Sequence, residues 1–201
     1  MATPGLIIGL GHRKRVGKDT FAGFLEEELT ERGYDVYHLS FARNMKDIAE
    51  TLFGMYGLRD AYHYEHNPEQ REQVLPRILK SPRQLWIEFG NAVRYIFPEI
   101  WVDRLRDQME SCSLHNTMNP GGPAAFIITD VRYLNEACAI RSMGGKLIKV
   151  NRAEVPPSDD VADSALANYT GWDREINNDL TLDYLSRMAG IVARDYSEQK
   201  A

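Results

Sequence analysis

Short apolar runs alternate along the chain with longer stretches in which apolar residues recur every three or four positions. Runs of four to six apolar residues bounded by glycine or polar residues are typical of buried strands. Recurrence at three and four positions is typical of helices that bury one face. The strands predicted in this way are at residues 5–10, 36–39, 125–129, 146–150 and 172–178. The predicted helices are one that begins at Lys18 and stops at Gly33, and those at 45–53, 82–97, 101–112, 134–143 and 182–196.

Three segments fit neither pattern. Residues 55–80 are polar, tyrosine-rich and weakly periodic, which predicts an irregular or helical insertion on the surface. Residues 115–123 predict a loop. Residues 153–171 contain Pro156, Pro157 and several Asp and Ser residues, so we expect a mobile flap there.

The alternation of strands with helices indicates an α/β protein built from βαβ units around a parallel sheet. Its 201 residues suit one complete domain and would be cramped for two. Crossover connections should be right-handed, and ligands should gather at the carboxyl ends of the strands. Each motif that carries chemistry is therefore expected at that edge of the sheet.

Charge and composition argue against two classes of binding partner, nucleic acids and membranes. The net charge of −5 argues against a nucleic-acid-binding protein, and no apolar run approaches the ~20 residues that span a bilayer. The spacing of Cys112 and Cys138 matches no metal or redox motif, so we expect two buried thiols. These features predict a cytoplasmic protein that binds neither nucleic acid nor membrane.

The strongest motif joins the first predicted strand to the helix that follows. Its sequence is GHRKRVGKDT at residues 11–20. The two glycines let backbone N–H groups turn around a phosphate, the helix directs its positive dipole end there, and Lys18 supplies charge. The residues predicted to bind the nucleotide are Gly11, Arg13, Lys14, Val16, Gly17, Lys18, Asp19 and Thr20.

This motif departs from the usual G-x-x-x-x-G-K-[ST] form. Five residues separate its glycines, and Asp19 takes the place of the Ser or Thr that binds Mg²⁺, with Thr20 one residue later. The competing interpretation is a solvated basic turn at residues 13–15 that caps a helix.

Asp130 and Arg132 follow the apolar strand predicted at 125–129. A carboxylate at that position can hold Mg²⁺ facing the phosphate loop, and an arginine two residues later can bind an acceptor phosphate. The metal ligands predicted in this way are Asp19, Thr20 and Asp130. Asp130 in such a turn also fits a simple helix cap.

The helix after Pro82 carries Arg83, Gly90 and Arg94 on one face. Its apolar side is formed by Leu85, Trp86, Phe89, Val93, Ile96 and Phe97. Two arginines with a glycine between them leave room for an anion, which suggests a monophosphate clamp. Spacing alone fits a solvated basic face equally well. His63 and His66 have no partner at metal-ligand spacing and are interpreted as surface histidines.

With these motifs in place, the chain resembles the bacteriophage-type deoxynucleoside monophosphate kinases, a branch of the P-loop kinases. The segments that carry the resemblance are GHRKRVGKDT, SFARNMKDIAETLFG, SPRQLWIEFGNAVR, PEIWVDRL, TDVRYLNEACAIRSMGG and KVNR. The block DVRYLNEA is the most specific, and Asp after the lysine of the phosphate loop is also a feature of this group.

The resemblance implies a three-layer α/β/α P-loop kinase fold spanning 1–201, with a mainly helical acceptor-binding insertion at about 42–113 and a lid at about 153–171. It implies ATP and Mg²⁺ as cofactors and a deoxynucleoside monophosphate as acceptor, in the host cytoplasm if the chain is phage-encoded. Lys18, Arg15, Asp130 and Arg132 would be catalytic, and Arg152 would contact the adenine or a phosphate. The substrate-binding residues it implies are Arg43, Lys46, Arg83, Gln84, Trp86, Gly90, Arg94, Arg132 and Glu136.

One departure concerns the lid, because residues 153–171 contain no arginine. Arg13, Lys14 and Arg15 are expected to supply the missing charge. Other acceptors also fit this architecture, such as phosphomevalonate or dephospho-coenzyme A, and so does a nucleotide-binding module with little turnover. Because dimers are the commonest oligomers of soluble proteins, the chain could also form a homodimer.

Overall fold

The computed structural model describes residues 5–11, 13–118, 121–156 and 164–198. The chain divides into two compact units, whose bounds are Met1–Leu39 with Asp107–Ala201 for one and Ser40–Arg106 for the other. They are called unit 1 and unit 2, and each is described by itself.

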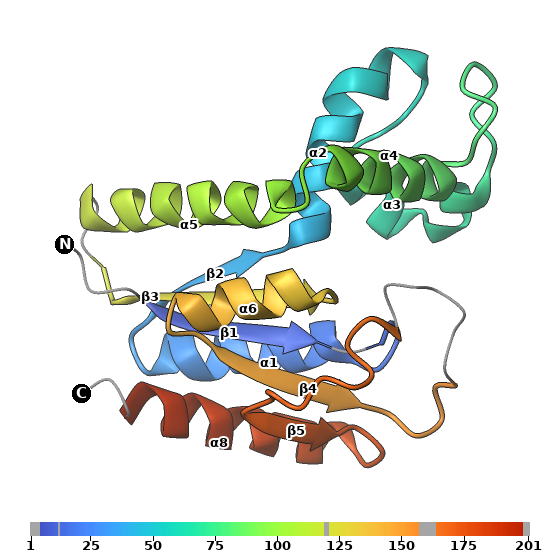
Figure 1. Cartoon of the computed structure of the whole chain (residues 1–201). Helices are drawn as coiled ribbons and strands as arrows, with labels where there is room; N and C mark the ends of the chain where they lie inside the picture. The colour runs from blue at the N-terminus through green and yellow to red at the C-terminus, as the bar shows by residue number, and fades with distance from the viewer. Residues whose placement is uncertain (1–4, 12, 119–120, 157–163, 199–201) are drawn as a thin grey trace. The chain divides into compact units, whose positions relative to one another are not determined.

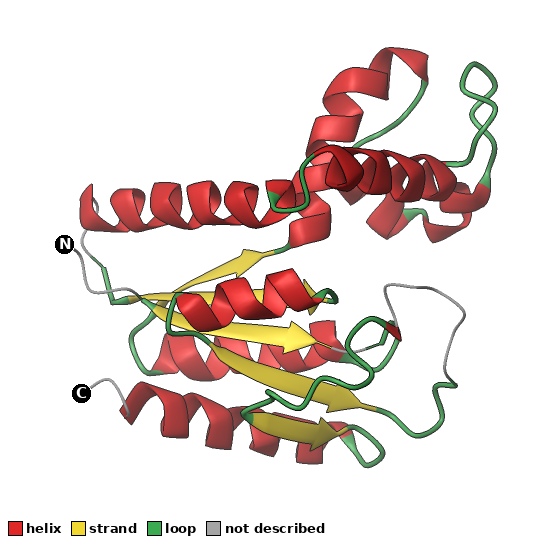
Figure 2. Cartoon of the chain, in the orientation of Figure 1, coloured by secondary structure: helices red, strands yellow, loops and turns green. Residues whose placement is uncertain are grey.

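Unit 1 contains a five-stranded, fully parallel sheet with the order β2-β3-β1-β4-β5 (Figures 1 and 2). The strands are β1 (Leu6–Gly11), β2 (Asp35–Leu39), β3 (Ala124–Val131), β4 (Lys146–Asn151) and β5 (Arg174–Asn177). This confirms the predicted α/β fold with a parallel sheet.

Strand β1 lies in the middle of the sheet, between β3 and β4. All six of its residues are buried, and its register pairs Leu6 with Ala125 and Ile8 with Lys146. A strand covered on both faces has no reason to alternate polar and apolar residues, which explains the continuous run LIIGLG.

Helices cover both faces of the sheet and make the three layers. Helix α1 (Lys18–Glu31) packs beside α8 (Leu182–Glu198) on one face, and α6 (Leu134–Ser142) lies on the other (Figure 1). One core cluster fills the space between the sheet and the α1–α8 pair. Its fully buried members include Phe21, Leu25, Ile127, Ile148 and Leu185.

Unit 2 is helical. It comprises α2 (Phe41–Phe53), η1 (Gly54–Tyr56), α3 (Ala61–His66), η2 (Pro68–Glu72), α4 (Pro82–Ile96) and the first residues of α5 (Ile100–Met118). Ser81 begins α4 with a capping box, in which its Oγ accepts from the Gln84 N–H at 3.2 Å. Tyr64, Leu85 and Trp86 form the centre of its own small core.

Four expectations from the sequence need correction. The segment 55–80 is not only a surface insertion, because Leu58 and Tyr64 are buried in the core of unit 2. The loop expected from residue 115 begins later, since α5 continues to Met118. Cys138 is exposed and Cys112 only half-buried, so the thiols are not both buried. Ile96 and Phe97 were assigned to the apolar side of α4, yet they are 81% and 47% exposed.

The flap expected at 153–171 lies partly outside the described residues, which omit 157–163. Among the helices of the described part of the chain, none is long and apolar enough to cross a membrane.

Candidate functional site

The loop between β1 and α1 occupies the point where the direction of the chain connections reverses. The chain leaves β1 for α1 on one face of the sheet and leaves the neighbouring strand β3 for α6 on the other (Figure 1). In open parallel sheets such a reversal opens a crevice at the carboxyl ends of the two strands, where ligands bind. The phosphate loop, Asp130 and Arg132 therefore lie at the same edge of unit 1.

Both glycines of the loop are required by their surroundings. A Cβ on Gly11 would overlap the indole of Trp172, with its Cζ3 only 2.7 Å away, and would lie 3.0 Å from the Val131 carbonyl oxygen. Gly17 has a φ of 92°, in the region that favours glycine, and a Cβ there would overlap the side-chain amide of Asn178. The sequence predicted the glycines for their freedom to turn, but close packing is the second reason.

Arg15 also has a positive φ, of 63°, although it is not glycine. A long side chain in this region costs energy, and such residues occur where the surrounding structure holds them in place. Its side chain is exposed. The loop therefore maintains a strained turn that directs an arginine outward.

Lys18 begins α1 and is only 7% exposed. Its Nζ donates to the carbonyl oxygen of Arg13 at 2.5 Å, a bond that closes the loop on itself. A buried ammonium at the positive end of a helix dipole is a strong site for an anion.

Arg13 supplies an observation that points to a ligand. Its Nη1 donates to the carbonyl oxygen of Val155 at 2.9 Å, but its buried Nε has no hydrogen-bond partner among the described residues. A buried, unpaired N–H of a charged group is costly. A phosphate oxygen would satisfy it, so the loop fits a nucleotide phosphate.

The three residues predicted to hold Mg²⁺ lie at the same edge of the sheet. Asp19 and Thr20 are exposed in the first turn of α1. Asp130 lies within β3, one residue before its end, and not after the strand as expected, because the strand continues to Val131. No group of three or more His, Cys, Asp or Glu residues is placed to bind a metal in the part of the chain that the structure describes. Mg²⁺ held partly by substrate phosphates needs only one or two protein ligands, so these residues fit that role.

Glu136 is 2% exposed, and its carboxylate accepts from the backbone N–H groups of Arg132 at 2.8 Å and Tyr133 at 3.0 Å. These bonds anchor the turn between β3 and α6. Glu136 therefore orients the backbone that carries Arg132. Direct contact of Glu136 with substrate stays a prediction.

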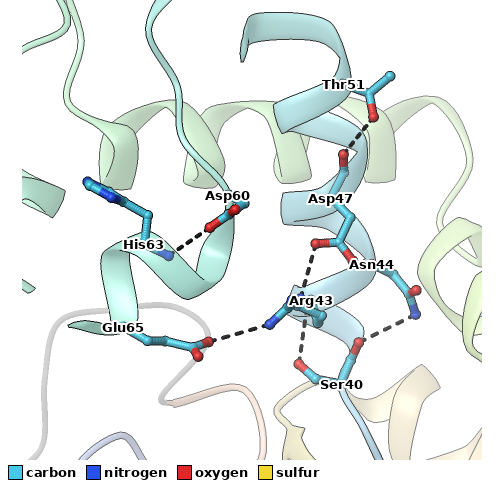
Figure 3. A network of polar contacts seen from close by, with 8 residues as sticks. All are labelled: Ser40, Arg43, Asn44, Asp47, Thr51, Asp60, His63 and Glu65. Carbon is cyan, nitrogen blue, oxygen red and sulfur yellow. Dashed lines mark hydrogen bonds and ion pairs between the residues drawn. The ribbon is translucent and has the colours of Figure 1, made fainter. Parts of the chain in front are cut away.

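Arg152 follows β4 and pairs with Glu154 at 3.1 Å on the surface. In unit 2, Arg43 lies in a polar network between α2 and α3 (Figure 3). Its Nε contacts Asp47 Oδ1 at 3.1 Å, and its Nη1 lies 3.7 Å from Glu65 Oε1.

The two arginines predicted to form a clamp on α4 contact different side chains. Arg83 Nη1 lies 3.4 Å from Glu72 Oε1, and Arg94 Nη1 contacts Asn91 Oδ1 at 3.5 Å. Between them Gly90 is buried, and Met45 of α2 lies beside it. Met45 lies at ordinary contact distance from the place that a Cβ of Gly90 would take. Anion binding between Arg83 and Arg94 stays a prediction.

Trp86 is 7% exposed, and the Lys46 Nζ lies 5.0 Å from the centroid of its ring. Tyr64 meets the same ring edge-on at 5.2 Å. Gln84 completes the capping box of α4, with its Oε1 accepting from the Ser81 N–H at 3.0 Å. Trp86 and Gln84 thus both have structural roles beside their predicted contact with substrate.

Comparison with known proteins identifies the family. No protein-family profile matches the chain. A protein of Acanthamoeba polyphaga mimivirus named "Putative deoxynucleotide monophosphate kinase" is 30% identical over 195 residues, covering 89% of this chain and 91% of the viral protein. The chain belongs to this kinase family.

This chain was also compared with solved structures. A sugar kinase from Janibacter sp. HTCC2649 matches it with 12% identity and a TM-score of 0.49 over 96% of each chain. A likeness at that level carries no weight for fold or function. The family assignment rests on the viral relative.

The sequence did not indicate three residues that contact the phosphate loop of the kinase. Val155 follows β4, Trp172 precedes β5, and Asn178 follows β5. The strand order, which places β1 beside β4, is the information that would have found them. No local motif marks these residues.

Proposed function

We propose that the kinase transfers the γ-phosphoryl group of ATP to a deoxynucleoside monophosphate, giving ADP and a deoxynucleoside diphosphate. The observation that carries the donor half is the loop that leads into α1, in which Lys18 is buried and the buried Nε of Arg13 has no hydrogen-bond partner among the described residues. The acceptor half is supported by the name of the mimivirus relative. The DVRYLNEA and GKDT segments favour the bacteriophage-type branch of the family.

Phosphoryl transfer depends mainly on positioning and on stabilising charge. Lys18 and the loop N–H groups would bind the β- and γ-phosphates of ATP, and Arg15 and Arg132 would stabilise charge on the transferred group. Mg²⁺, when bound, would neutralise charge on the donor phosphates, and Asp19, Thr20 and Asp130 would hold it. The acceptor phosphate is largely ionised at pH 7, since its second pKa is about 6, and needs no strong general base.

Unit 2 offers arginines for the acceptor phosphate. Arg43 and Arg83 are paired with carboxylates, but these pairs are 43–62% exposed. Exposed ion pairs contribute roughly 0–1 kcal/mol, so a phosphate dianion can replace the carboxylate at little cost. Each glutamate or aspartate then holds its arginine in place until substrate binds.

The reaction is tested by ADP release from ATP and Mg²⁺ with separate acceptors. The panel is dAMP, dGMP, dCMP, dTMP, their ribose counterparts and mevalonate 5-phosphate. Turnover with one or more deoxynucleotides supports the proposal and gives the base preference. Turnover only with mevalonate 5-phosphate would replace the acceptor, and tight ATP binding without transfer would indicate a regulatory module.

Lys18 is tested by the near-isosteric change Lys18→Met, with Lys80→Met as the matched control. Losing one preorganised positive donor should lower kcat/KM by about 10²–10³-fold. Lys80 pairs with Glu88 on the surface of unit 2, at 2.7 Å, and its loss should leave kcat/KM within about twofold. Equal activity of Lys18→Met and the wild type would remove the phosphate-loop assignment.

Arg15 needs two variants because its backbone and side chain contribute separately. Arg15→Gly removes the guanidinium and relieves the positive φ, whereas Arg15→Ala removes the guanidinium and keeps the strain. A similar loss of kcat in both variants would assign the effect to the guanidinium. Unchanged kcat in both would exclude Arg15 from catalysis.

A further inference from the structure

Asn178 joins the carboxyl end of the sheet to the phosphate loop. It follows β5 directly, and its backbone N–H donates to the Asn151 carbonyl oxygen at 2.7 Å, which ties it to the end of β4. From this fixed position its Nδ2 donates to the carbonyl oxygen of Val16 at 3.0 Å. The two bonded residues are 162 positions apart in the sequence.

The hydrogen bond acts on a peptide group that is followed by a glycine. Val16 is fully buried and cannot move easily, but the next residue is Gly17, with a φ of 92°. Glycine adopts positive and negative φ with similar ease, so the peptide between residues 16 and 17 has a low barrier to reversing its direction. A Cβ added to Gly17 would overlap the side-chain amide of Asn178, so this amide lies directly against the peptide.

The orientation of that peptide decides what the loop presents to a ligand. In a planar trans peptide the C=O and the N–H point in opposite directions. Because the Val16 C=O points to Asn178, the Gly17 N–H points away from it. A reversed peptide would direct a carbonyl oxygen where an N–H donor had been, and a carbonyl repels an anion.

We propose that Asn178 is a positioning residue that fixes the Val16–Gly17 peptide so that the Gly17 N–H is presented to the phosphates of ATP. This inference rests on the proposed function for the identity of the nucleotide. It adds a determinant of donor binding that lies outside the loop and its motif. Asn178 acts through the loop backbone and does not itself contact the reacting atoms.

The test compares Asn178→Asp with Asn177→Asp. Both changes convert an amide to a carboxylate of nearly the same size, one residue apart at the same end of β5. Asn177 is exposed, and its Oδ1 accepts from Asn151 Nδ2 at 3.4 Å, so it makes no bond to the loop in the described structure. The pair separates loss of the Val16 bond from the effect of an added negative charge near the nucleotide.

ATP affinity is measured by calorimetry without acceptor, and KM for each substrate by ADP release. We expect Asn178→Asp to weaken ATP binding at least tenfold, with the acceptor KM within about twofold of the wild type. Asn177→Asp should stay within about twofold for both substrates. Equal weakening by the two variants, or a parallel rise in the acceptor KM, would overturn the positioning role.

A second measurement covers the case in which Asn178→Asp does not fold. Asn178→Ala also removes the donor, and the Gly17 amide resonance is followed by ¹⁵N NMR as ATP is added to ¹⁵N-labelled protein. The amide should shift strongly in the wild type and much less in the variant, whereas equal shifts in both would overturn the inference.

The calorimetric arm keeps the two proposals distinguishable. A wild-type protein that binds ATP without phosphorylating any acceptor would remove the proposed acceptor, and the Asn178 comparison would still be decisive. A wild-type protein that does not bind ATP would overturn both.

Discussion

Replacing Gly11 with alanine tests why the phosphate loop begins with glycine. The added Cβ would lie 2.7 Å from Trp172 Cζ3 and 3.0 Å from the Val131 carbonyl oxygen. Both separations are shorter than ordinary van der Waals contact, and one of the two atoms belongs to the backbone of a central strand. The indole must therefore move, or β1 must shift away from β3.

The size of the effect follows from two opposing contributions. Overpacking a filled site costs about 1–3 kcal/mol, while replacing glycine by alanine in a strand otherwise gains about 0.5–1 kcal/mol. We expect a net loss of about 1–2 kcal/mol. In a protein of this size each kcal/mol lowers Tm by about 2–4 °C, so the fall should be about 2–8 °C.

The assay is thermal unfolding followed by circular dichroism, with Gly23→Ala as the control. Gly23 lies inside α1, and a Cβ added there would meet no atom of the described residues within 4 Å. Alanine at this position should therefore raise stability by about 0.8–1 kcal/mol. If Gly11→Ala lowers the thermal stability and Gly23→Ala raises it, the Gly11 effect is assigned to the contact with Trp172.

A double-mutant cycle then tests the contact itself. Trp172→Leu removes most of the ring that the new methyl group strikes, so Gly11→Ala should cost little in that background. The expected coupling is about 1–2 kcal/mol. Additive losses, or a Gly11→Ala variant as stable as the wild type, would refute the packing explanation.

Three further predictions concern other parts of the chain. Ser81→Ala should lower the free energy of unfolding by about 1 kcal/mol in urea titrations, because α4 loses its capping oxygen. The hydrogen bond from Arg174 holds the pKa of Asp195 below its ordinary value, so its stabilisation is present above about pH 4 and is lost as pH falls through the lowered pKa. Unfolding measured from pH 2 to 6 should therefore depend less on pH in Asp195→Asn. Iodoacetamide should label exposed Cys138 before Cys112, whose pKa is raised by burial, and mass spectrometry showing the reverse order would contradict the burial of Cys112.

Local patterns were enough to predict the strand, loop and helix that make the phosphate loop. The apolar run, the Gly-Lys pair and the helical spacing after Lys18 all lie within about 25 residues, and neighbours in sequence decide each of them. The loop's outer contacts were not predictable in this way. Val155 and Asn178 reach it across 142 and 162 residues, through a strand order that no local pattern contains.

In unit 2 the prediction from sequence failed for a different reason, the short length of the elements. Its segment from residue 55 to 80 folds as one six-residue helix and two 3₁₀ turns, which are too short to produce a clear period. Tyr64 was therefore assigned to the surface although its ring packs against Trp86 in the core. Spacing likewise places Gly90 on one face of α4 but does not reveal that Met45 lies beside it.

The central place of β1 has a consequence for how the protein is made. During synthesis β1 leaves the ribosome before its two neighbours, β3 and β4, which come more than a hundred residues later. The sheet consequently has high contact order and cannot close until most of the chain has been translated. Until then a strand of six apolar or glycine residues has both edges unpaired, and an unpaired apolar edge favours aggregation of nascent and truncated chains.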